Sequence, residues 1–273
     1  MPKSLDSIGF IGAGRMATAL ARGCVQAGLV EGGQVLAADP HQPALQAFAD
    51  QIPDARLAGS NPEVLSGAHV VILAVKPQIM ASVLADIAKA VQQQHLLVSI
   101  AAGVTLNTLS AALPVGTRLV RVMPNTPCLV GLGASGYSRG SAASDADGKL
   151  VKQILESVGL AFELDEALLD AVTGLSGSGP AFVYRLIAAM AEGGAAGGLP
   201  SELAVKLAAQ TARGAAEMVL TTGQSPAKLC EQVTSPGGTT LAGLEVLEGL
   251  NGPDAFRVAI EAATRRSKEL GQT

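Results

Sequence analysis

The sequence has very few aromatic side chains: no tryptophan, two tyrosines and five phenylalanines in 273 residues. A core without large rings is filled by small and aliphatic side chains, and 32 glycines let segments of backbone approach one another closely. We therefore expect alanine-rich helices with tight contacts between backbones. A chain of this length buries a substantial core and suits one large or two modest domains, of which we expect two.

Clusters of positive charge are also missing, since the net charge is −4 and lysine and arginine form no run. Proteins that bind nucleic acids or anionic membranes carry basic patches, so we expect neither as a partner, and a small molecule as the ligand. The first residues, 1–6, contain no apolar signal core, and the most apolar segment, 181–199, is interrupted by Arg185, Glu192 and glycines. We expect a cytoplasmic protein.

Cysteine and histidine are scarce and scattered. Cys24, Cys128 and Cys230 are odd in number and far apart, which is typical of reduced thiols and not of a disulfide framework. His41, His69 and His95 stand alone in polar or strand-edge contexts, and no cysteine pairs with a histidine at metal-ligand spacing. The sequence therefore predicts no metal site and assigns no catalytic role to histidine.

The N-terminal part has the pattern of a strand, a glycine turn and a helix. Apolar residues 7–11 lead into Gly12-Ala13-Gly14-Arg15-Met16-Ala17, a G-x-G-x-x-A pattern. In such a turn the first glycine allows the sharp bend and the second lets the backbone approach a pyrophosphate. With a second apolar strand at residues 34–38, this predicts dinucleotide binding.

Asp39 ends that second strand, where a carboxylate reaches the ribose of adenosine. Because a carboxylate repels a 2′-phosphate, Asp39 favours NAD. Arg56 and His41 are candidate partners for a 2′-phosphate, so NADP stays open. In the alternative interpretation Asp39 is a turn residue before a proline.

Strands and helices then alternate as in a parallel sheet, with apolar runs at 70–75, 96–100 and 119–123. Small or polar loops follow these runs, at the strand ends where open α/β sheets bind ligands. We expect the cofactor, NADP(H) or NAD(H), to contact residues of these loops and of the glycine turn: Ile11, Gly12, Gly14, Arg15, Met16, Asp39, Asn61, Ala74, Val75, Lys76, Pro77, Ala101, Gly103, Asn125 and Thr126.

Several of these residues also have structural interpretations. Asn61 is a candidate N-cap, Lys76 a candidate solvated residue, and Asn125 and Thr126 form a rigid turn between two prolines. Late strands at 133–137 and 161–164, with a helix at 145–157 capped by Ser144, complete the expected α/β Rossmann domain, residues 1–164.

From residue 165 to 273 the pattern is helical, and prolines and glycines mark the ends of the expected helices. The helix at 200–221 has an apolar stripe with small residues elsewhere, which indicates burial on more than one side. So much apolar helix is hard to bury in a lone bundle. We therefore expect an all-α domain through which subunits associate.

The segment Ser235-Pro236-Gly237-Gly238-Thr239-Thr240 is a small-residue turn before a helical pattern. Its glycines let backbone N–H groups converge, and a helix N-terminus near Thr239 favours a carboxylate or phosphate. The alternative is an ordinary interhelical loop with a good N-cap. A second loop, 174–180, has three glycines and two serines and is either a cofactor-facing turn or a flexible joint.

Five motifs in order resemble pyrroline-5-carboxylate reductases over nearly the whole chain. They lie at residues 11–17, 74–78 (Ala-Val-Lys-Pro-Gln), 123–127 (Met-Pro-Asn-Thr-Pro), 174–181 and 235–240. Arg15 departs from the asparagine usual in the family. The resemblance implies a Rossmann domain followed by an all-helical dimerisation and substrate-binding domain. It also implies reduction of 1-pyrroline-5-carboxylate to L-proline by NADPH or NADH, in a homodimer assembled into a larger homo-oligomer such as a decamer.

The resemblance further implies that Ser235, Gly238 and Thr239, in one loop with Gly237, hold the substrate carboxylate. It places the Thr240 hydroxyl at the ring nitrogen, which makes Thr240 the candidate catalytic residue, in a loop contributed by the partner subunit. A cyclic imine is protonated in solution, so positioning is the main requirement and no strong internal acid is needed.

Two other functions are compatible with this architecture. One is a β-hydroxyacid dehydrogenase, which uses a helix-borne lysine; Lys206 is the only lysine inside the long helix and lacks the accompanying asparagine motif. The other is a nicotinamide-binding sensor without turnover. The choice between NADPH and NADH, the size of the oligomer and the range of imines stay open here, as does whether Thr240 donates a proton or only orients the imine.

Overall fold

The computed structural model of the protein describes residues 5–271. The chain forms two compact units, a sheet unit that runs to Ser178 and resumes at Ala262, and a helical unit, Gly179–Glu261. Among the described residues no helix is both long and apolar enough to cross a membrane. The expected lack of a signal core concerns a segment whose residues 1–4 lie outside this range.

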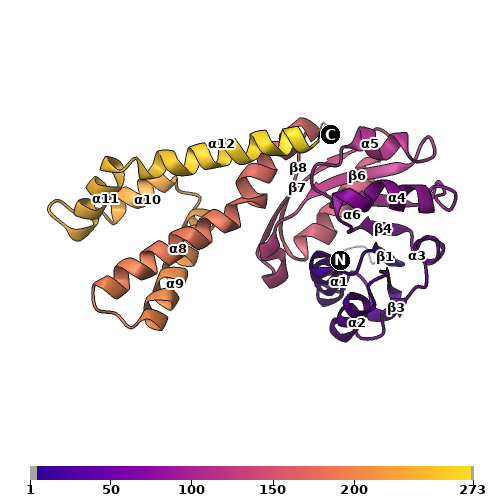
Figure 1. Ribbon diagram of the computed structural model, residues 1–273, viewed down its shortest axis with the longest axis horizontal. Helices are drawn as coiled ribbons and strands as arrows, with labels where there is room; N and C mark the ends of the chain where they lie inside the picture. Colours follow the sequence, from indigo (N-terminus) through magenta and orange to yellow (C-terminus); the bar gives the residue numbers. More distant parts are fainter. Residues whose placement is uncertain (1–4, 272–273) are drawn as a thin grey trace. The chain divides into compact units, whose positions relative to one another are not determined.

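A sheet forms the centre of the sheet unit (Figure 1). It has eight strands in the order β3-β2-β1-β4-β5-β6-β7-β8. The first six strands are parallel, β7 is antiparallel to β6, and β8 is parallel to β7. The order 3-2-1-4-5-6 is that of a Rossmann fold, which confirms the predicted class. The strands are β1 (Ile8–Ile11), β2 (Val35–Ala38), β3 (Arg56–Leu57), β4 (Val70–Leu73), β5 (Leu96–Ser99), β6 (Arg118–Met123), β7 (Gly133–Arg139) and β8 (Gly159–Glu163).

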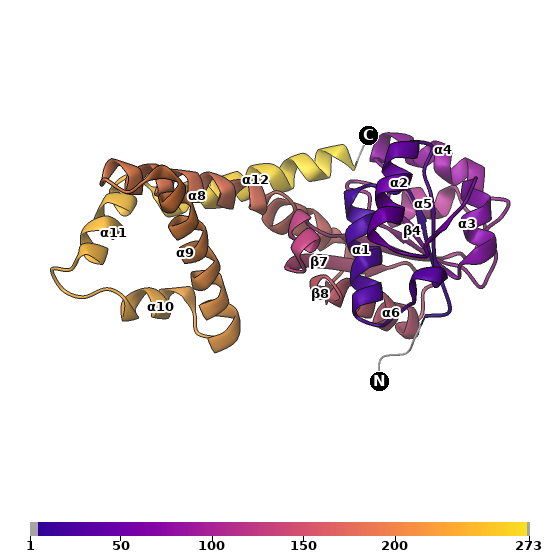
Figure 2. The same cartoon turned by 90° about the horizontal axis from the view of Figure 1, so that it is seen from below.

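The central strands are apolar throughout because helices cover both faces of the sheet (Figure 2). Phe10 of β1 points to one face and packs against Phe48, with ring centroids 5.7 Å apart. Its neighbour Ile11 points to the other face, toward the core around Leu84. One face carries α1 (Arg15–Gln26), α2 (Gln42–Gln51) and α6 (Asp145–Glu156), and the other carries α3 (Asn61–Gly67), α4 (Pro77–Ile87) and α5 (Leu106–Ala111).

The cap predicted for α6 is present. The Ser144 hydroxyl accepts a hydrogen bond from the Asp147 backbone N–H at 3.2 Å, and the Asp147 carboxylate accepts one from the Ser144 N–H at 2.8 Å. This reciprocal arrangement satisfies two donors that the first turn of a helix otherwise leaves free.

The glycine-rich segment 174–180 is helical and not a loop. A π-helical turn, Thr173–Gly177, connects α7 (Leu169–Val172) to α8 (Gly179–Ala196). The Ser176 hydroxyl donates to the carbonyl of Val172 at 3.0 Å, which helps to hold the turn. A side chain at Gly177 would place its Cβ 2.5 Å from the terminal methyl group of Met123 on β6, so that flexible side chain would have to move.

Residues just after position 164 pack with the sheet although they are helical. Glu166, in the 3₁₀ turn Glu166–Leu168, accepts hydrogen bonds from the buried Arg121 at 2.9 Å and from the Leu106 N–H at 2.7 Å. Asp170 accepts one from the buried Ser267 at 2.6 Å. The domain boundary between residues 164 and 165 stays a prediction; it marks the change from strands to helices.

The helical unit is built around α8 and α9 (Ser201–Thr222), which pack through small residues. Ala191, Ala204 and Ala208 are buried, and a Cβ on Gly194 would lie 3.3 Å from Leu199. The unit also contains α10 (Pro226–Gln232), α11 (Thr239–Gly249) and the first part of α12 (Gly252–Leu270).

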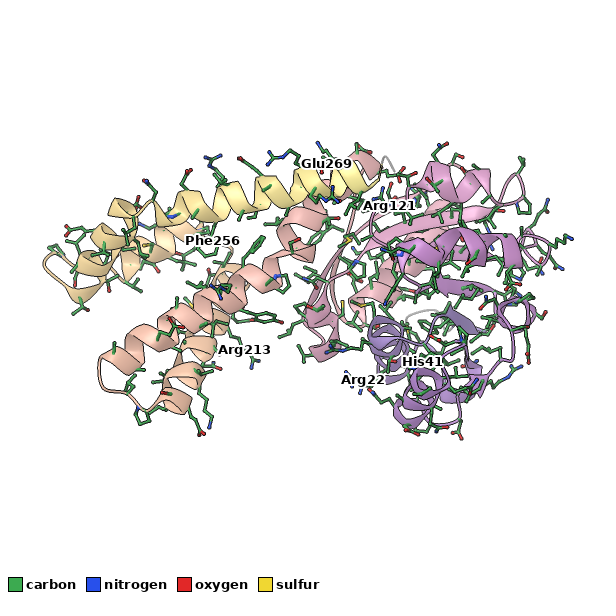
Figure 3. All side chains as sticks on the ribbon, viewed as in Figure 1. Arg22, His41, Arg121, Arg213, Phe256 and Glu269 are labelled. Atoms are coloured by element: carbon green, nitrogen blue, oxygen red, sulfur yellow. The ribbon has the colours of Figure 1, made fainter. Side chains whose placement is uncertain are left out.

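Large apolar side chains of this unit are exposed in the single chain. The predicted stripe on α9 is open, with Leu203 44%, Leu207 48% and Met218 50% exposed. Phe256 of α12 (labelled in Figure 3) and Phe182 of α8 line an apolar hollow of about 340 Å³. An exposed apolar surface of this extent is typical of a protein–protein contact.

Candidate active site

The glycine turn after β1 has the geometry that its pattern predicts. Gly12 has φ +95°, and a Cβ there would lie 2.6 Å from the carbonyl oxygen of Ala74, so only glycine fits. Gly14 is the N-cap of α1, and the position its Cβ would occupy has no atom within 4 Å. The turn therefore leaves open space in front of a helix N-terminus, which favours a bound anion such as a pyrophosphate.

A cleft of about 830 Å³ lies at the carboxyl ends of β1, β2 and β4. Many of the residues expected to bind a dinucleotide line it: Ile11, Gly12, Gly14, Asp39, Asn61, Ala74, Val75 and Lys76. Strands that are far apart in the sequence thus bring these residues together at the switch point of the sheet, where open α/β folds bind ligands. The cleft, together with the open space at Gly14 in front of α1, fits a dinucleotide cofactor.

The Asp39 side chain is fixed in this cleft by two backbone groups. One carboxylate oxygen accepts a hydrogen bond from the N–H of Ala13 in the glycine turn, and the other accepts one from the N–H of His41, each at 2.8 Å. Asp39 therefore forms a local turn, as the alternative interpretation expected, and at the same time ties β2 to the glycine turn.

One face of α4 also lines the cleft, and the sequence analysis missed it. The residues are Ile79, Ser82, Val83 and Asp86, whose spacing of three and four residues was the available signal. The Asn61 side-chain amide donates to the Asp86 carboxylate at 2.9 Å. The interpretation of Asn61 as an N-cap is wrong, because Ser60 caps α3 by accepting a hydrogen bond from the Glu63 N–H at 3.4 Å.

Three predicted residues flank the cleft. Arg15 is exposed and lines a neighbouring hollow of about 380 Å³ together with Arg22, which donates to the carbonyl of Leu129 at 2.6 Å. Figure 3 labels Arg22 and His41, which come from α1 and from the start of α2. Met16 is half-buried against the core, and Pro77 is the first residue of α4.

Two loops further along the sheet hold the remaining predicted residues. Ala101 is buried in the core, and a Cβ on Gly103 would lie 3.7 Å from the backbone of Leu270. Asn125, after β6, is also buried, while Thr126 is exposed at the start of a 3₁₀ turn, Thr126–Val130. None of the four is among the residues that line the cleft at β1, β2 and β4.

The predicted substrate loop lies in the helical unit, and α11 begins at Thr239 as expected. Gly237 adopts φ +69°, and the N–H of Gly238 donates to the carbonyl of Ser235 at 3.0 Å, which closes the turn. Thr239 and Thr240 form the first positions of the helix, where backbone N–H groups lack partners within the helix. A helix N-terminus of this kind favours a carboxylate.

The buried cysteines are unsuited to nucleophilic catalysis. Burial raises the pKa of the Cys24 thiol to about 12 and also raises the pKa of Cys128, so both stay protonated near neutral pH. In the part of the chain that the structure describes, no three His, Cys, Asp or Glu side chains are placed to hold a metal. Lys206 is exposed on α9, and no observation favours a hydroxyacid dehydrogenase.

Two family models match the chain. One, described as NADP oxidoreductase, coenzyme F420-dependent, matches residues 7–103. The other, described as pyrroline-5-carboxylate reductase dimerisation, matches residues 166–270. The first covers the glycine turn and the residues that line the cleft, and the second covers the loop before α11.

Relatives match over nearly the full length. Pyrroline-5-carboxylate reductase 3 of Mus musculus is 46% identical, covering 97% of this chain and 96% of the relative, and pyrroline-5-carboxylate reductase of Methanosarcina acetivorans is 44% identical, covering 98% of each. The solved pyrroline-5-carboxylate reductase of Coxiella burnetii superposes with a TM-score of 0.92 at 34% identity, covering 99% of this chain and all of that one. The Plasmodium falciparum pyrroline carboxylate reductase, solved with NADP bound, superposes with a TM-score of 0.87 at 33% identity, covering 98% of this chain and 99% of that one. The chain belongs to the pyrroline-5-carboxylate reductase family.

Proposed function

We propose that the protein reduces 1-pyrroline-5-carboxylate to L-proline with NAD(P)H. The observation that carries this function is the presence, in one chain of this family, of a dinucleotide cleft behind the Gly12 turn and an anion-binding loop before α11. A cofactor site alone fits many dehydrogenases. The loop at Ser235–Thr240 adds a place for a substrate carboxylate, which a sensor without turnover would not need.

The sheet unit holds the cofactor. Backbone N–H groups at the start of α1 receive the pyrophosphate, where Gly14 leaves space, and Asp39, Asn61 and Lys76 contact the rest of the nucleotide. When bound, the reduced nicotinamide supplies the hydride. Asn125 and Thr126, which follow β6, border the part of the cofactor site that holds the nicotinamide ring.

The loop before α11 holds the substrate. Ser235, Gly237, Gly238 and Thr239 surround its carboxylate, with donors from the Ser235 and Thr239 hydroxyls and from the backbone N–H groups at the start of α11. The Thr240 hydroxyl hydrogen-bonds the ring nitrogen. The imine carbon of the protonated ring accepts the hydride, so the C=N bond becomes a single bond and the nitrogen becomes the amine of proline. The loop acts mainly by orienting the ring, which needs no strong acid.

The functional form is a homodimer in the cytoplasm, assembled into a larger homo-oligomer such as a decamer, in which the substrate loop comes from the partner subunit. The open apolar stripe on α9 supports association through the helical unit. Gel filtration with light scattering tests this part: a stable monomer in dilute solution contradicts it.

The activity is tested by adding 1-pyrroline-5-carboxylate to the purified protein with NADPH or NADH. Loss of the nicotinamide absorbance, with L-proline formed in equal amount, is the expected result. Oxidation of neither nucleotide would contradict the proposed function. A control with a hydroxyacid and NAD(P)⁺ distinguishes the other dehydrogenase class.

A further inference from the structure

We infer that the adenosine side of the cleft selects NADH over NADPH, and that Asp39 is the residue that sets this preference. The inference rests on the proposed function and deepens it by naming the cofactor. NADH and NADPH differ only in a phosphate on the 2′ oxygen of the adenosine ribose. Selectivity therefore depends on the groups at the end of β2 that face this oxygen.

The Asp39 carboxylate is held where that oxygen binds. Its oxygens accept hydrogen bonds from the Ala13 N–H in the glycine turn and from the His41 N–H before α2, each with an N–O distance of 2.8 Å. Rotating the side chain out of the cleft would break both hydrogen bonds and leave two backbone donors without partners. The negative charge is therefore a fixed part of the site.

The same two hydrogen bonds occupy backbone N–H donors that an anion at the end of β2 would otherwise accept from. The Ala13 and His41 N–H groups are directed at Asp39, Pro43 has no N–H, and the Ala44 N–H donates to the carbonyl of His41 at 2.9 Å. Of the first donors of α2, this leaves the Gln42 N–H for a phosphate, so this helix N-terminus offers fewer donors than helix N-termini ordinarily do. Asp39 takes the place that a 2′-phosphate would occupy.

The other charged groups that line the cleft stand at β4 and α4, and β1 separates β4 from the end of β2 where Asp39 lies. Asp86 of α4 is a second carboxylate, paired with Asn61 at 2.9 Å, and Lys76 stands at the end of β4, at the start of α4. Arg56, a candidate phosphate partner from the sequence, has its guanidinium 3.6 Å from the Cβ position of Gly67 and does not line the cleft.

Arg15 and Arg22 are two further cations near the glycine turn. Both line a hollow that adjoins the cleft and shares Gly14 and Ala44 with it, and Arg22 there donates a hydrogen bond to the Leu129 carbonyl at 2.6 Å. A free ribose, by contrast, donates its hydroxyl hydrogens to the unused lone pairs of the Asp39 oxygens, which makes a charge-assisted hydrogen bond. A 2′-phosphate would meet this carboxylate at close range and be repelled.

The dissociation constants of NADH and NADPH, measured by nucleotide fluorescence on the full-length protein, test the inference. We expect NADH to bind at least about tenfold more tightly, which corresponds to about 1.4 kcal/mol. Asp39→Ser and Asp39→Asn remove the charge and are expected to abolish most of this ratio, chiefly by tightening NADPH. Asp50→Asn, an equal change of charge on the exposed face of α2, is the matched control and leaves the ratio unchanged.

Equal affinities or tighter binding of NADPH by the unmodified protein overturn the inference, whether or not the variants fold. So does a ratio that the Asp39 variants leave unchanged, or a preference for NADPH that Arg15→Asn removes. Turnover of 1-pyrroline-5-carboxylate is measured in parallel with each nucleotide. Absence of turnover with both contradicts the proposed function, while the binding ratio still decides the role of Asp39.

Discussion

The side-chain amide of Asn125 donates a hydrogen bond to the backbone carbonyl of Ser176, 3.1 Å away, across 51 positions of sequence. The amide oxygen accepts one from the Ala134 N–H at 2.9 Å. One buried side chain thus joins the loop after β6 to β7 and to the π-helical turn. It positions the loop that we assign to the nicotinamide side of the site.

The substitution Asn125→Asp tests the two hydrogen bonds that the Asn125 side chain makes to Ser176 and Ala134. The change keeps the size and one acceptor oxygen, but places a second oxygen against the Ser176 carbonyl, so a buried acceptor loses its donor. We expect a loss of about 1–3 kcal/mol in the free energy of unfolding, measured with urea. We also expect a lower kcat with a nearly unchanged KM for the nucleotide.

Asn107→Asp is the control, because it makes the same chemical change at an exposed position of α5. If the free energy of unfolding and the kcat of Asn125→Asp equal those of Asn107→Asp, the hydrogen bonds to Ser176 and Ala134 do not position the loop.

The glycine turn gives a pair of matched variants. Gly12→Ala forces a side chain onto φ +95° and against the Ala74 carbonyl, and we expect it to destabilise the sheet unit by about 1–3 kcal/mol or more. The Cβ added by Gly14→Ala would lie in open space, and Gly14 has φ −72°, which alanine adopts readily. The free energy of unfolding should therefore change by less than about 1 kcal/mol. The added methyl group instead enters the space for the pyrophosphate, so nucleotide affinity should fall. Tight nucleotide binding by Gly14→Ala would show that the cofactor lies elsewhere.

His95 makes the stability depend on pH. Its Nδ1 accepts the Gln92 N–H at 2.9 Å and its Nε2 lies 3.0 Å from the Leu65 carbonyl, so the neutral ring fits both partners. Burial lowers the pKa of His95 below the ordinary 6.5. Below that pH the unfolded chain binds a proton that the folded chain does not, so the free energy of unfolding falls as pH falls.

Urea unfolding between about pH 7.5 and about pH 5 measures this effect. We expect His95→Gln to show a smaller loss of stability over this range than the unmodified protein, and His41→Gln, at an exposed position, to behave like the unmodified protein. Equal pH profiles for all three would exclude His95 as a source of the dependence.

Much of the fold was predictable because its signals are local. The strand, glycine turn and helix at 7–26 follow from an apolar run, two glycines and the helical period. Ser144 was predictable as the N-cap of α6 from its position before the helix. The antiparallel direction of β7 was not predictable, since strand direction depends on pairing with β6. The hydrogen bonds of Asn125 and of Asp39 were also missed, because their partners are set by the tertiary fold.

Thr240→Val removes the hydroxyl at nearly constant volume. If the hydroxyl only orients the imine, we expect kcat/KM for the substrate to fall about tenfold, the effect of one hydrogen bond. Proton donation would make the loss about 100-fold or more. Nucleotide affinity should stay unchanged, and Thr240→Ser, which keeps the hydroxyl, should recover most of the activity. Unchanged kinetics in Thr240→Val would remove Thr240 from the mechanism.

Transfer of a labelled hydride tests the central claim most directly. The protein is supplied with 1-pyrroline-5-carboxylate and NADH that carries deuterium at both C4 positions, and the product is analysed by mass spectrometry and NMR. We predict L-proline with one deuterium on the ring carbon that was the imine carbon. Proline without deuterium, or no proline while the nucleotide stays reduced, would contradict hydride transfer to the imine by this protein.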